Sequence, residues 1–156
     1  MRVVGAFLHP WQRKWIIDRA QRATFVLGRQ GTGYEKFEVP ADEALPLRAR
    51  CLQQLGLAAG APHDCYLIRY GVGASIPPHV DPAPEGQEHH RINCVATAAQ
   101  GGALLVRHHP VALYSRDAYV FRPDLELHEV TLVTRGERLV FSLGTLLPTK
   151  PCEGST

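Results

Sequence analysis

The chain has little of several features that would place it in a specialised class of protein. Its 156 residues include one Met and four Cys, and no two cysteines are spaced as CxxC. This pattern argues against a zinc knuckle or a disulfide framework, and it predicts reduced thiols at Cys51, Cys65, Cys94 and Cys152. The sequence also contains no internal repeat and no low-complexity tract.

Long apolar runs and a strong charge imbalance are missing too. No run approaches the length of a membrane span, and residues 3–8 are too short for the apolar region of a signal peptide, so we expect no membrane association and a cytoplasmic location. The formal net charge is only +2, without a dense basic stripe, so we expect no nucleic-acid partner. The sequence leaves the oligomeric state open.

What is present is a globular composition with many turns: 45% apolar residues, 21% charged residues, 12 Pro and 14 Gly. A chain of this length can bury one core, so we expect residues 1–156 to form a single domain. Pro10, followed by Trp11 and Trp15 at helical spacing, predicts a first helix, and residues 46–57 predict a second. These helices would make residues 1–63 a helical buttress.

The remaining residues up to 147 predict a β core. Short runs of β-formers separated by turn signals occupy residues 66–70, 92–98, 103–106, 111–114, 118–121, 125–133 and 139–143. Their spacing is typical of a sandwich, jelly roll or barrel, so we predict a mainly β (α+β) fold. Residues 28–33 are expected to be a loop, residues 28–40 and 82–90 are candidate lids, and His89 and His90 are expected to be exposed.

Three side chains in this core predict a metal site. His79 and Asp81 are two residues apart, so in an extended segment they point to the same face. His128 alternates with Val130 in a later strand, which turns its imidazole toward the core. Two His and one carboxylate from facing strands form the facial triad that suits non-haem Fe(II) and leaves further coordination positions open.

Arg138 follows His128 by ten residues and begins the next apolar run. An inward-facing arginine on a strand is costly unless it is paired. The carboxylate of a co-substrate would supply that pair in the bidentate geometry that a guanidinium favours. Arg135 is the competing candidate, but it lies at the preceding turn, where we expect it to be solvated.

The order of these motifs resembles that of the prolyl 4-hydroxylases. Residues 70–81 (YGVGASIPPHVD) resemble their YGVG…PHxD segment, and residues 91–95 (RINCV) resemble the start of their RxxT/CxxxYL strand. Residues 101–104 (GGAL) and 128–130 (HEV), the latter followed by Gly136-Glu137-Arg138, resemble their GGxL and HEV…GxR motifs. The resemblance covers residues 64–146 in all.

This resemblance implies a double-stranded β-helix, a jelly-roll or cupin-like barrel, that works as an Fe(II)- and 2-oxoglutarate-dependent dioxygenase. Its iron would be held by His79, Asp81 and His128, with O2 as oxidant, succinate and CO2 as products, and ascorbate as reductant. Arg138 would take the distal carboxylate of 2-oxoglutarate, and Tyr70 would donate a hydrogen bond near it. The substrate would be a protein residue or an amino-acid-like molecule.

Arg91 would face the substrate entrance by the same resemblance. The sequence departs from the family after this residue, because residues 94–99 (CVATAA) lack the aromatic that often contacts 2-oxoglutarate. Three alternatives stay open: a small-metabolite or natural-product hydroxylase of the same superfamily, a cupin-like binding protein or isomerase, and a catalytically silent interaction module. The absence of an HxH motif argues against the cupin alternative.

Overall fold

The computed structural model describes residues 1–149 and is mainly β, as predicted. Its two helices are α1 (Pro10–Arg22) and α2 (Leu45–Gln54). Its strands are β1 (Arg2–Val4), β2 (Val26–Leu27), β3 (Thr32–Glu38), β4 (Asp64–His79), β5 (Gln87–Thr97), β6 (Gln100–Gly101), β7 (Leu104–Val106), β8 (His109–Pro110), β9 (Ala118–Phe121), β10 (His128–Val130), β11 (Val133–Arg135) and β12 (Arg138–Pro148).

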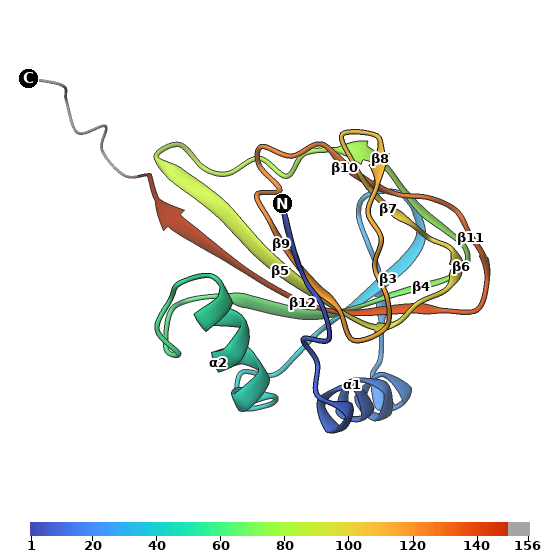
Figure 1. Cartoon of the computed structure of the whole chain (residues 1–156), viewed down its shortest axis with the longest axis horizontal. Helices are drawn as coiled ribbons and strands as arrows, with labels where there is room; N and C mark the ends of the chain where they lie inside the picture. The colour runs from blue at the N-terminus through green and yellow to red at the C-terminus, as the bar shows by residue number, and fades with distance from the viewer. Residues whose placement is uncertain (150–156) are drawn as a thin grey trace, which may run out of the picture.

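Ten of the strands form one antiparallel sheet with the order β1-β9-β5-β12-β4-β10-β7-β8, to which β3 adds on β4 and β2 adds on β3. The strands β11 and β6 pair separately. Figure 1 shows the large sheet curling on itself, with both helices beneath β5, β12 and β4. This curl brings strands that are distant in the sequence to face one another across the inside of the barrel.

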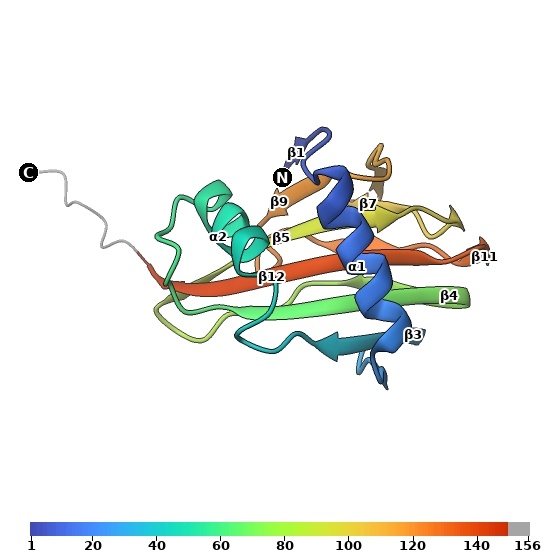
Figure 2. The ribbon, with the colours of Figure 1, turned by 90° about the horizontal axis from the view of Figure 1, so that it is seen from below.

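The helices cover the outer face of the sheet. Figure 2 shows α1 crossing β12 and β4 on this side. Ile16 from α1 and Leu52 from α2 pack against outward-facing strand residues such as Leu67 and Phe141, all fully buried. Burial of one such side chain stabilises the fold by about 1.5–3 kcal/mol. Because this packing fixes the central strands from outside, their inward side chains are free to form a site.

Strand β12 contributes side chains both to the outer core, under the helices, and to the inside of the barrel. Leu139, Phe141 and Leu143 pack among the outer core residues, whereas Arg138 and Ser142 alternate with them and point inward. Every residue from 138 to 145 is buried. A strand covered on both sides has an almost continuous apolar sequence, so the sequence predicted this element. The prediction stopped at residue 143 because Gly144 and Thr145 interrupt the apolar run.

The helices agree with the sequence-based prediction except at one end. Helix α1 begins at Pro10, where proline lacks only a hydrogen bond that the first turn does not need. Helix α2 ends at Gln54 instead of residue 57. Gly56 adopts a left-handed conformation with φ 76° and its N–H donates to the Gln53 carbonyl, so the chain leaves the helix earlier than Gly60.

Three predictions about strands and loops were wrong. The loop predicted at residues 28–33 ends at residue 31, and most of the candidate lid 28–40 is strand β3, which forms because β4 offers it a pairing edge. Residues 111–114 form no strand; Val111 and Leu113 bury their side chains against Leu104 and Tyr119 without a ladder of their own. His89 and His90 are half-buried members of β5, paired with β12 rather than exposed in a loop.

Two further expectations concern chemistry and membranes. Cys51, Cys65 and Cys94 are free, buried thiols, as predicted, and Cys152 lies outside the described residues. Burial raises the pKa of the Cys65 thiol to about 12, so this group stays protonated. Among residues 1–149, no helix is both long enough and apolar enough to cross a membrane.

Candidate metal centre

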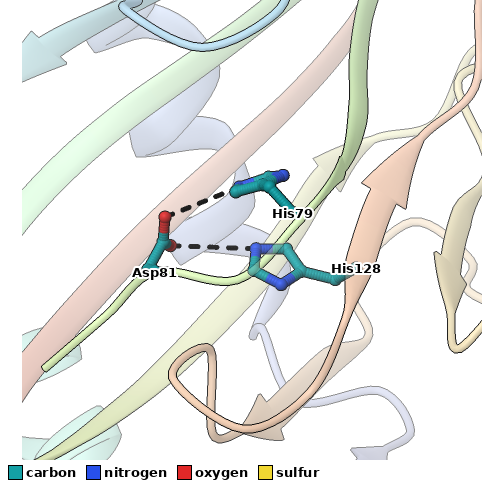
Figure 3. A group of neighbouring side chains, drawn as sticks. All are labelled: His79, Asp81 and His128. Carbon is teal, nitrogen blue, oxygen red and sulfur yellow. Dashed lines mark ion pairs between the residues drawn. The ribbon is translucent and has the colours of Figure 1, made fainter.

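The structure brings His79, Asp81 and His128 together at one end of the barrel. His79 is the last residue of β4, and His128 is the first residue of β10, which pairs with it directly. The two imidazole centroids are 4.2 Å apart. Asp81 follows β4 by two residues and turns its carboxylate toward both rings, and Figure 3 shows the three side chains converging.

The spacing of these side chains suits a shared metal ion. One carboxylate oxygen of Asp81 is 3.5 Å from Nε2 of His79, and the other is 3.8 Å from Nε2 of His128. The three candidate ligand atoms all lie within 4.8 Å of one another. Ligands about 2.1 Å from one ion at right angles would be roughly 3 Å apart, so a small inward movement of each side chain would complete the site.

Hydrogen bonds on the far side of both imidazoles select the tautomer that binds metal. Nδ1 of His79 lies 2.9 Å from the carbonyl oxygen of Pro77, and Nδ1 of His128 lies 2.8 Å from that of Glu126. A carbonyl oxygen can only accept, so each Nδ1 carries the proton and donates it. The lone pair is therefore on Nε2, the nitrogen that faces Asp81, which is the arrangement expected of metal-ligating histidines.

The surroundings of His128 keep its imidazole neutral. Its pKa is lowered first by burial and then by the neighbouring charges of His79 and Arg91, while the Glu126 carbonyl and Asp81 oppose the shift. The ring edge also packs against Phe121, with 5.1 Å between the centroids. A neutral imidazole is the form that can coordinate a metal, so burial prepares this ligand instead of leaving it in competition with a proton.

Asp81 is positioned by two contacts from distant segments. Its backbone N–H donates to the carbonyl oxygen of Pro123 over 2.8 Å. The side-chain amide of Gln30 donates to one of its carboxylate oxygens over 3.1 Å. Gln30 lies in the predicted loop before β3, and the sequence gives no signal that would assign it to this site.

A cavity of about 200 Å³ opens beside the three side chains. Its wall consists of residues from the inner face of the sheet and from the segment before β3: Gln30, Tyr34, Lys36, Tyr66, Ile68, Tyr70, Ile76, His79, Asp81, Arg91, Asn93, Leu104, Tyr119, His128, Val130 and Ser142. Tyr70 and Arg91, both predicted from the sequence as site residues, therefore line the same cavity as the candidate ligands.

Arg138 lies behind the wall of this cavity, at the start of β12 and opposite Tyr70. Only 4% of it is exposed, and its guanidinium carbon is 5.1 Å from the centre of the Tyr70 ring. Its Nη2 is 3.5 Å from the Tyr119 hydroxyl, while its buried Nη1 has no hydrogen-bond partner. No carboxylate among residues 1–149 forms an ion pair with it, so the group is a buried cation that lacks an anion.

Tyr119 on β9 is a site residue that the sequence analysis missed. Its hydroxyl oxygen accepts from the Asn93 amide at 2.8 Å and faces Arg138 on the other side. Because the oxygen accepts from these two donors, its own proton is available to a bound molecule. The alternation of Tyr119 with Phe121 in the predicted strand 118–121 was a signal that both point inward.

The hydroxyl of Tyr70 stays protonated. This residue is fully buried, and burial raises the pKa of its phenol well above the usual range even though the positive charge of Arg138 opposes the shift. A neutral phenol can donate a hydrogen bond but cannot act as an anionic ligand. Tyr70 also packs on Tyr34, with ring centroids 5.7 Å apart.

No protein-family model matches the chain, and no curated protein matches it by sequence. Solved structures do. A prolyl-4-hydroxylase from Pseudomonas putida is 18% identical with a TM-score of 0.78, covering 96% of this chain and 92% of its own. A Trichoplax adhaerens prolyl hydroxylase, solved with a hypoxia inducible factor peptide fragment, is 16% identical with a TM-score of 0.69, covering 92% and 81%.

HygX from Streptomyces hygroscopicus, solved with nickel, 2-oxoglutarate and hygromycin B bound, is 13% identical with a TM-score of 0.72, covering 94% of this chain and 82% of its own. At such identities the likeness establishes the fold. It confirms the predicted jelly-roll fold, and it extends over nearly the whole chain, including the N-terminal segment for which the sequence showed no family motif.

Proposed function

We propose that this chain is an Fe(II)- and 2-oxoglutarate-dependent dioxygenase that hydroxylates its substrate and releases succinate and CO2. The observation that carries the proposal is the combination of two features in one barrel. His79, Asp81 and His128 form a facial set of metal ligands, and Arg138 is a buried cation without an anion in the same interior. Either feature alone would allow other functions.

The ligand set fits iron better than a structural metal. Two imidazoles and one carboxylate are the donors of non-haem Fe(II) oxygenases, and three protein ligands leave positions for a co-substrate and O2. A structural zinc site would instead be closed by four protein ligands. Bound iron would supply the oxidative chemistry, and the protein would supply the ligands, orientation and exclusion of water.

Arg138 and Tyr119 together fit the distal carboxylate of 2-oxoglutarate. The free Nη1 of Arg138 and the available proton of the Tyr119 hydroxyl would both donate to it. Tyr119 would thus fill the role of the aromatic that is missing from residues 94–99. Tyr70 would donate to the co-substrate from the same wall as a neutral phenol.

The substrate is either a protein residue or a smaller molecule. The Trichoplax neighbour holds a peptide and HygX holds hygromycin B, so the shared barrel accommodates both classes. The non-catalytic alternatives are a cupin-like binding protein and a silent interaction module. Neither explains why the ligand set is intact and why Arg138 is buried without an anion. We expect ascorbate to support turnover by keeping the iron reduced.

Succinate formation from 2-oxoglutarate in the presence of Fe(II) and ascorbate tests the proposal. Wild-type protein should form succinate, and His79→Ala should not. Arg138→Leu should weaken 2-oxoglutarate binding by more than about tenfold, the loss expected for one charge-assisted hydrogen-bond pair, while leaving Mn(II) binding close to wild type.

Arg135→Leu is the matched control, because this exposed arginine lies three residues earlier in the chain. It should leave both affinities unchanged. Wild-type succinate formation that is no faster than in protein-free controls, or that persists in His79→Ala, would rule out the proposed reaction.

A further inference from the structure

Part of the cavity wall carries polar side chains that neither the candidate metal centre nor the proposed co-substrate site uses. We call it the mouth cluster and define it by Lys36, Tyr66, Arg91 and Ser142, all of which line the cavity. These residues come from β3, β4, β5 and β12, neighbouring strands of the curled sheet. The cluster is separate from Arg138, which begins β12 four residues before Ser142 and does not line this cavity.

Arg91 is held in a fixed orientation within this cluster. It lies on β5 opposite Gly144 of β12, and Asp64 lies opposite the same glycine on the other side, on β4. The Arg91 side chain crosses over Gly144: Nη2 reaches the Asp64 carboxylate at 2.9 Å and Nη1 donates to the Ser142 hydroxyl at 2.8 Å. The guanidinium plane is therefore fixed before any ligand arrives.

Gly144 is the residue that makes room for this crossing. A Cβ at position 144 would lie 2.6 Å from the guanidinium carbon of Arg91, closer than carbon atoms can approach. The backbone of Gly144 has an ordinary φ, so glycine is needed here for space and not for conformation. Arg91 lines the cavity, and its Nε–H makes no hydrogen bond within residues 1–149, so this donor is free to bind a ligand.

Lys36 adds a second cation on the other side of Tyr66. Its Nζ is 5.1 Å from the centre of the Tyr66 ring, and it forms no ion pair with any residue between 1 and 149. Arg91 is paired with Asp64 and Lys36 is unpaired within residues 1–149, so these three side chains together carry one net positive charge. Among the described residues that line the cavity, Asp81 alone has a carboxylate, and it faces the candidate metal ligands.

We infer that the mouth cluster binds a carboxylate of the molecule that is oxidised, and that the substrate is a small organic acid such as a free amino acid. This inference rests on the proposed function and narrows its substrate class. A carboxylate would pair with Lys36 and the prepared Arg91 through charge-assisted hydrogen bonds. An internal residue of a polypeptide other than Asp or Glu has no carboxylate, so its binding would bury Lys36 without an anion.

The size of the cavity agrees with a small substrate. Its volume of about 200 Å³ is below the roughly 300–1,000 Å³ of typical ligand pockets, and it must also hold the co-substrate. Arg91 lines the same cavity as His79, Asp81 and His128. A carboxylate bound at the mouth cluster would therefore place its own aliphatic carbons within the cavity that the candidate metal ligands share.

The test compares free acids with their primary amides as stimulators of succinate formation. Two pools are added to protein with Fe(II), ascorbate and 2-oxoglutarate: the common free L-amino acids, and the same amino acids as amides. We expect the acid pool to stimulate succinate formation and the amide pool to give at least about tenfold less stimulation, as loss of one charged pair implies. Equal stimulation by both pools, stimulation by neither, or stimulation only by peptides would overturn the inference.

Two variants assign the effect to the mouth cluster. Arg91→Gln and Lys36→Met should each lose most of the stimulation by acids, and each should bind 2-oxoglutarate within about threefold of wild type, since that anion belongs to Arg138. Arg69→Gln and Lys14→Met are the matched controls. Arg69 also pairs with a carboxylate on a neighbouring strand, that of Glu35, but it does not line this cavity.

These readouts separate the two possible failures. If wild-type protein neither binds nor consumes 2-oxoglutarate, the proposed function itself is wrong. If it consumes 2-oxoglutarate but Arg91→Gln and Lys36→Met respond to the acid pool as wild type does, only the assignment of the mouth cluster is wrong. Lys36 is only half-buried, so its variant gives a result even if Arg91→Gln does not fold.

Discussion

The backbone N–H of Asp81 donates a hydrogen bond to the carbonyl oxygen of Pro123, with 2.8 Å between the two atoms. This bond joins the end of the segment that carries His79 to the turn that precedes His128. The turn is itself braced, because the Arg122 guanidinium donates two hydrogen bonds to the Asp124 carboxylate. The two halves of the candidate metal site are therefore connected through this main-chain hydrogen bond.

Removing the brace should destabilise the protein in a pH-dependent way. The hydrogen bonds from Arg122 lower the pKa of Asp124, whose side chain is only 8% exposed. A lowered pKa in the folded state gives stability that is present above the unfolded value of about 3.9 and is lost as the pH falls through the folded value. Asp124→Asn should therefore lower the free energy of unfolding by about 1–2 kcal/mol at pH 7 and by less at pH 3, which lies below the unfolded value.

Urea unfolding at the two pH values measures this difference. Asp18→Asn is the control, because Asp18 pairs with Lys14 on the exposed face of α1 and such pairs contribute little. A loss of stability in Asp124→Asn that is the same at pH 7 and pH 3 would show that the carboxylate charge is not what stabilises the turn.

Loss of His128 should abolish metal binding without unfolding the barrel. His128→Ala removes one of the three proposed ligands. Loss of a residue that only hydrogen-bonds to a ligand typically lowers metal affinity about 10–100-fold, so we expect His128→Ala to lower it by more than about 100-fold. Titration with Mn(II), which does not oxidise during the measurement, gives the affinity, and far-UV circular dichroism reports the fold. His109→Ala, at an exposed histidine on β8, should bind Mn(II) as wild type does.

Tyr119→Phe should weaken 2-oxoglutarate binding while leaving the metal in place. The variant removes one hydroxyl donor from the proposed carboxylate site, a change of about 0.5–1.5 kcal/mol or roughly threefold to tenfold in affinity. Calorimetric titration of the Mn(II)-loaded protein with 2-oxoglutarate measures the change. Tyr114→Phe serves as control because Tyr114 is exposed, and equal affinities in the two variants would remove Tyr119 from the site.

Gly144→Ala should destabilise the protein because the added methyl group overlaps the guanidinium of Arg91. Forcing an extra carbon into a packed position typically costs about 1–3 kcal/mol. Gly71→Ala is the matched control on a paired strand, since nothing lies within 4 Å of a Cβ at that position. Urea unfolding in which the two alanine variants are equally stable would mean that Arg91 moves aside freely and is not held over β12.

The sequence was sufficient to predict the local parts of the site. His79 and Asp81 are two residues apart on an extended segment, and His128 alternates with the buried Val130, so strand periodicity alone placed each side chain on an inner face. The inward Arg138 followed from the same alternation. Helix α1 was predicted because Pro10 and the spacing of its tryptophans are local signals.

The tertiary structure decided everything that depends on one strand meeting another. Strand β3 exists because β4 offers an edge, and Val111 and Leu113 form no strand but pack, partly buried, against the cluster that includes Leu104 and Tyr119. Gln30 and Tyr119 reach the site from segments that carry no motif. These contacts join residues far apart in the chain, and strand periodicity says which way a side chain points but not what it meets.

The same division applies to the chemistry of this protein. Its sequence by itself determined a mainly β chain with two imidazoles, one carboxylate and one arginine directed inward. Only the folded barrel decided that Nε2 faces the metal position, that Arg138 has no anion, and that Arg91 lies across Gly144 beside Asp64. The physical reason is that tautomer, charge balance and packing space are properties of neighbours in space, which the curl of the sheet brings together and the order of residues does not.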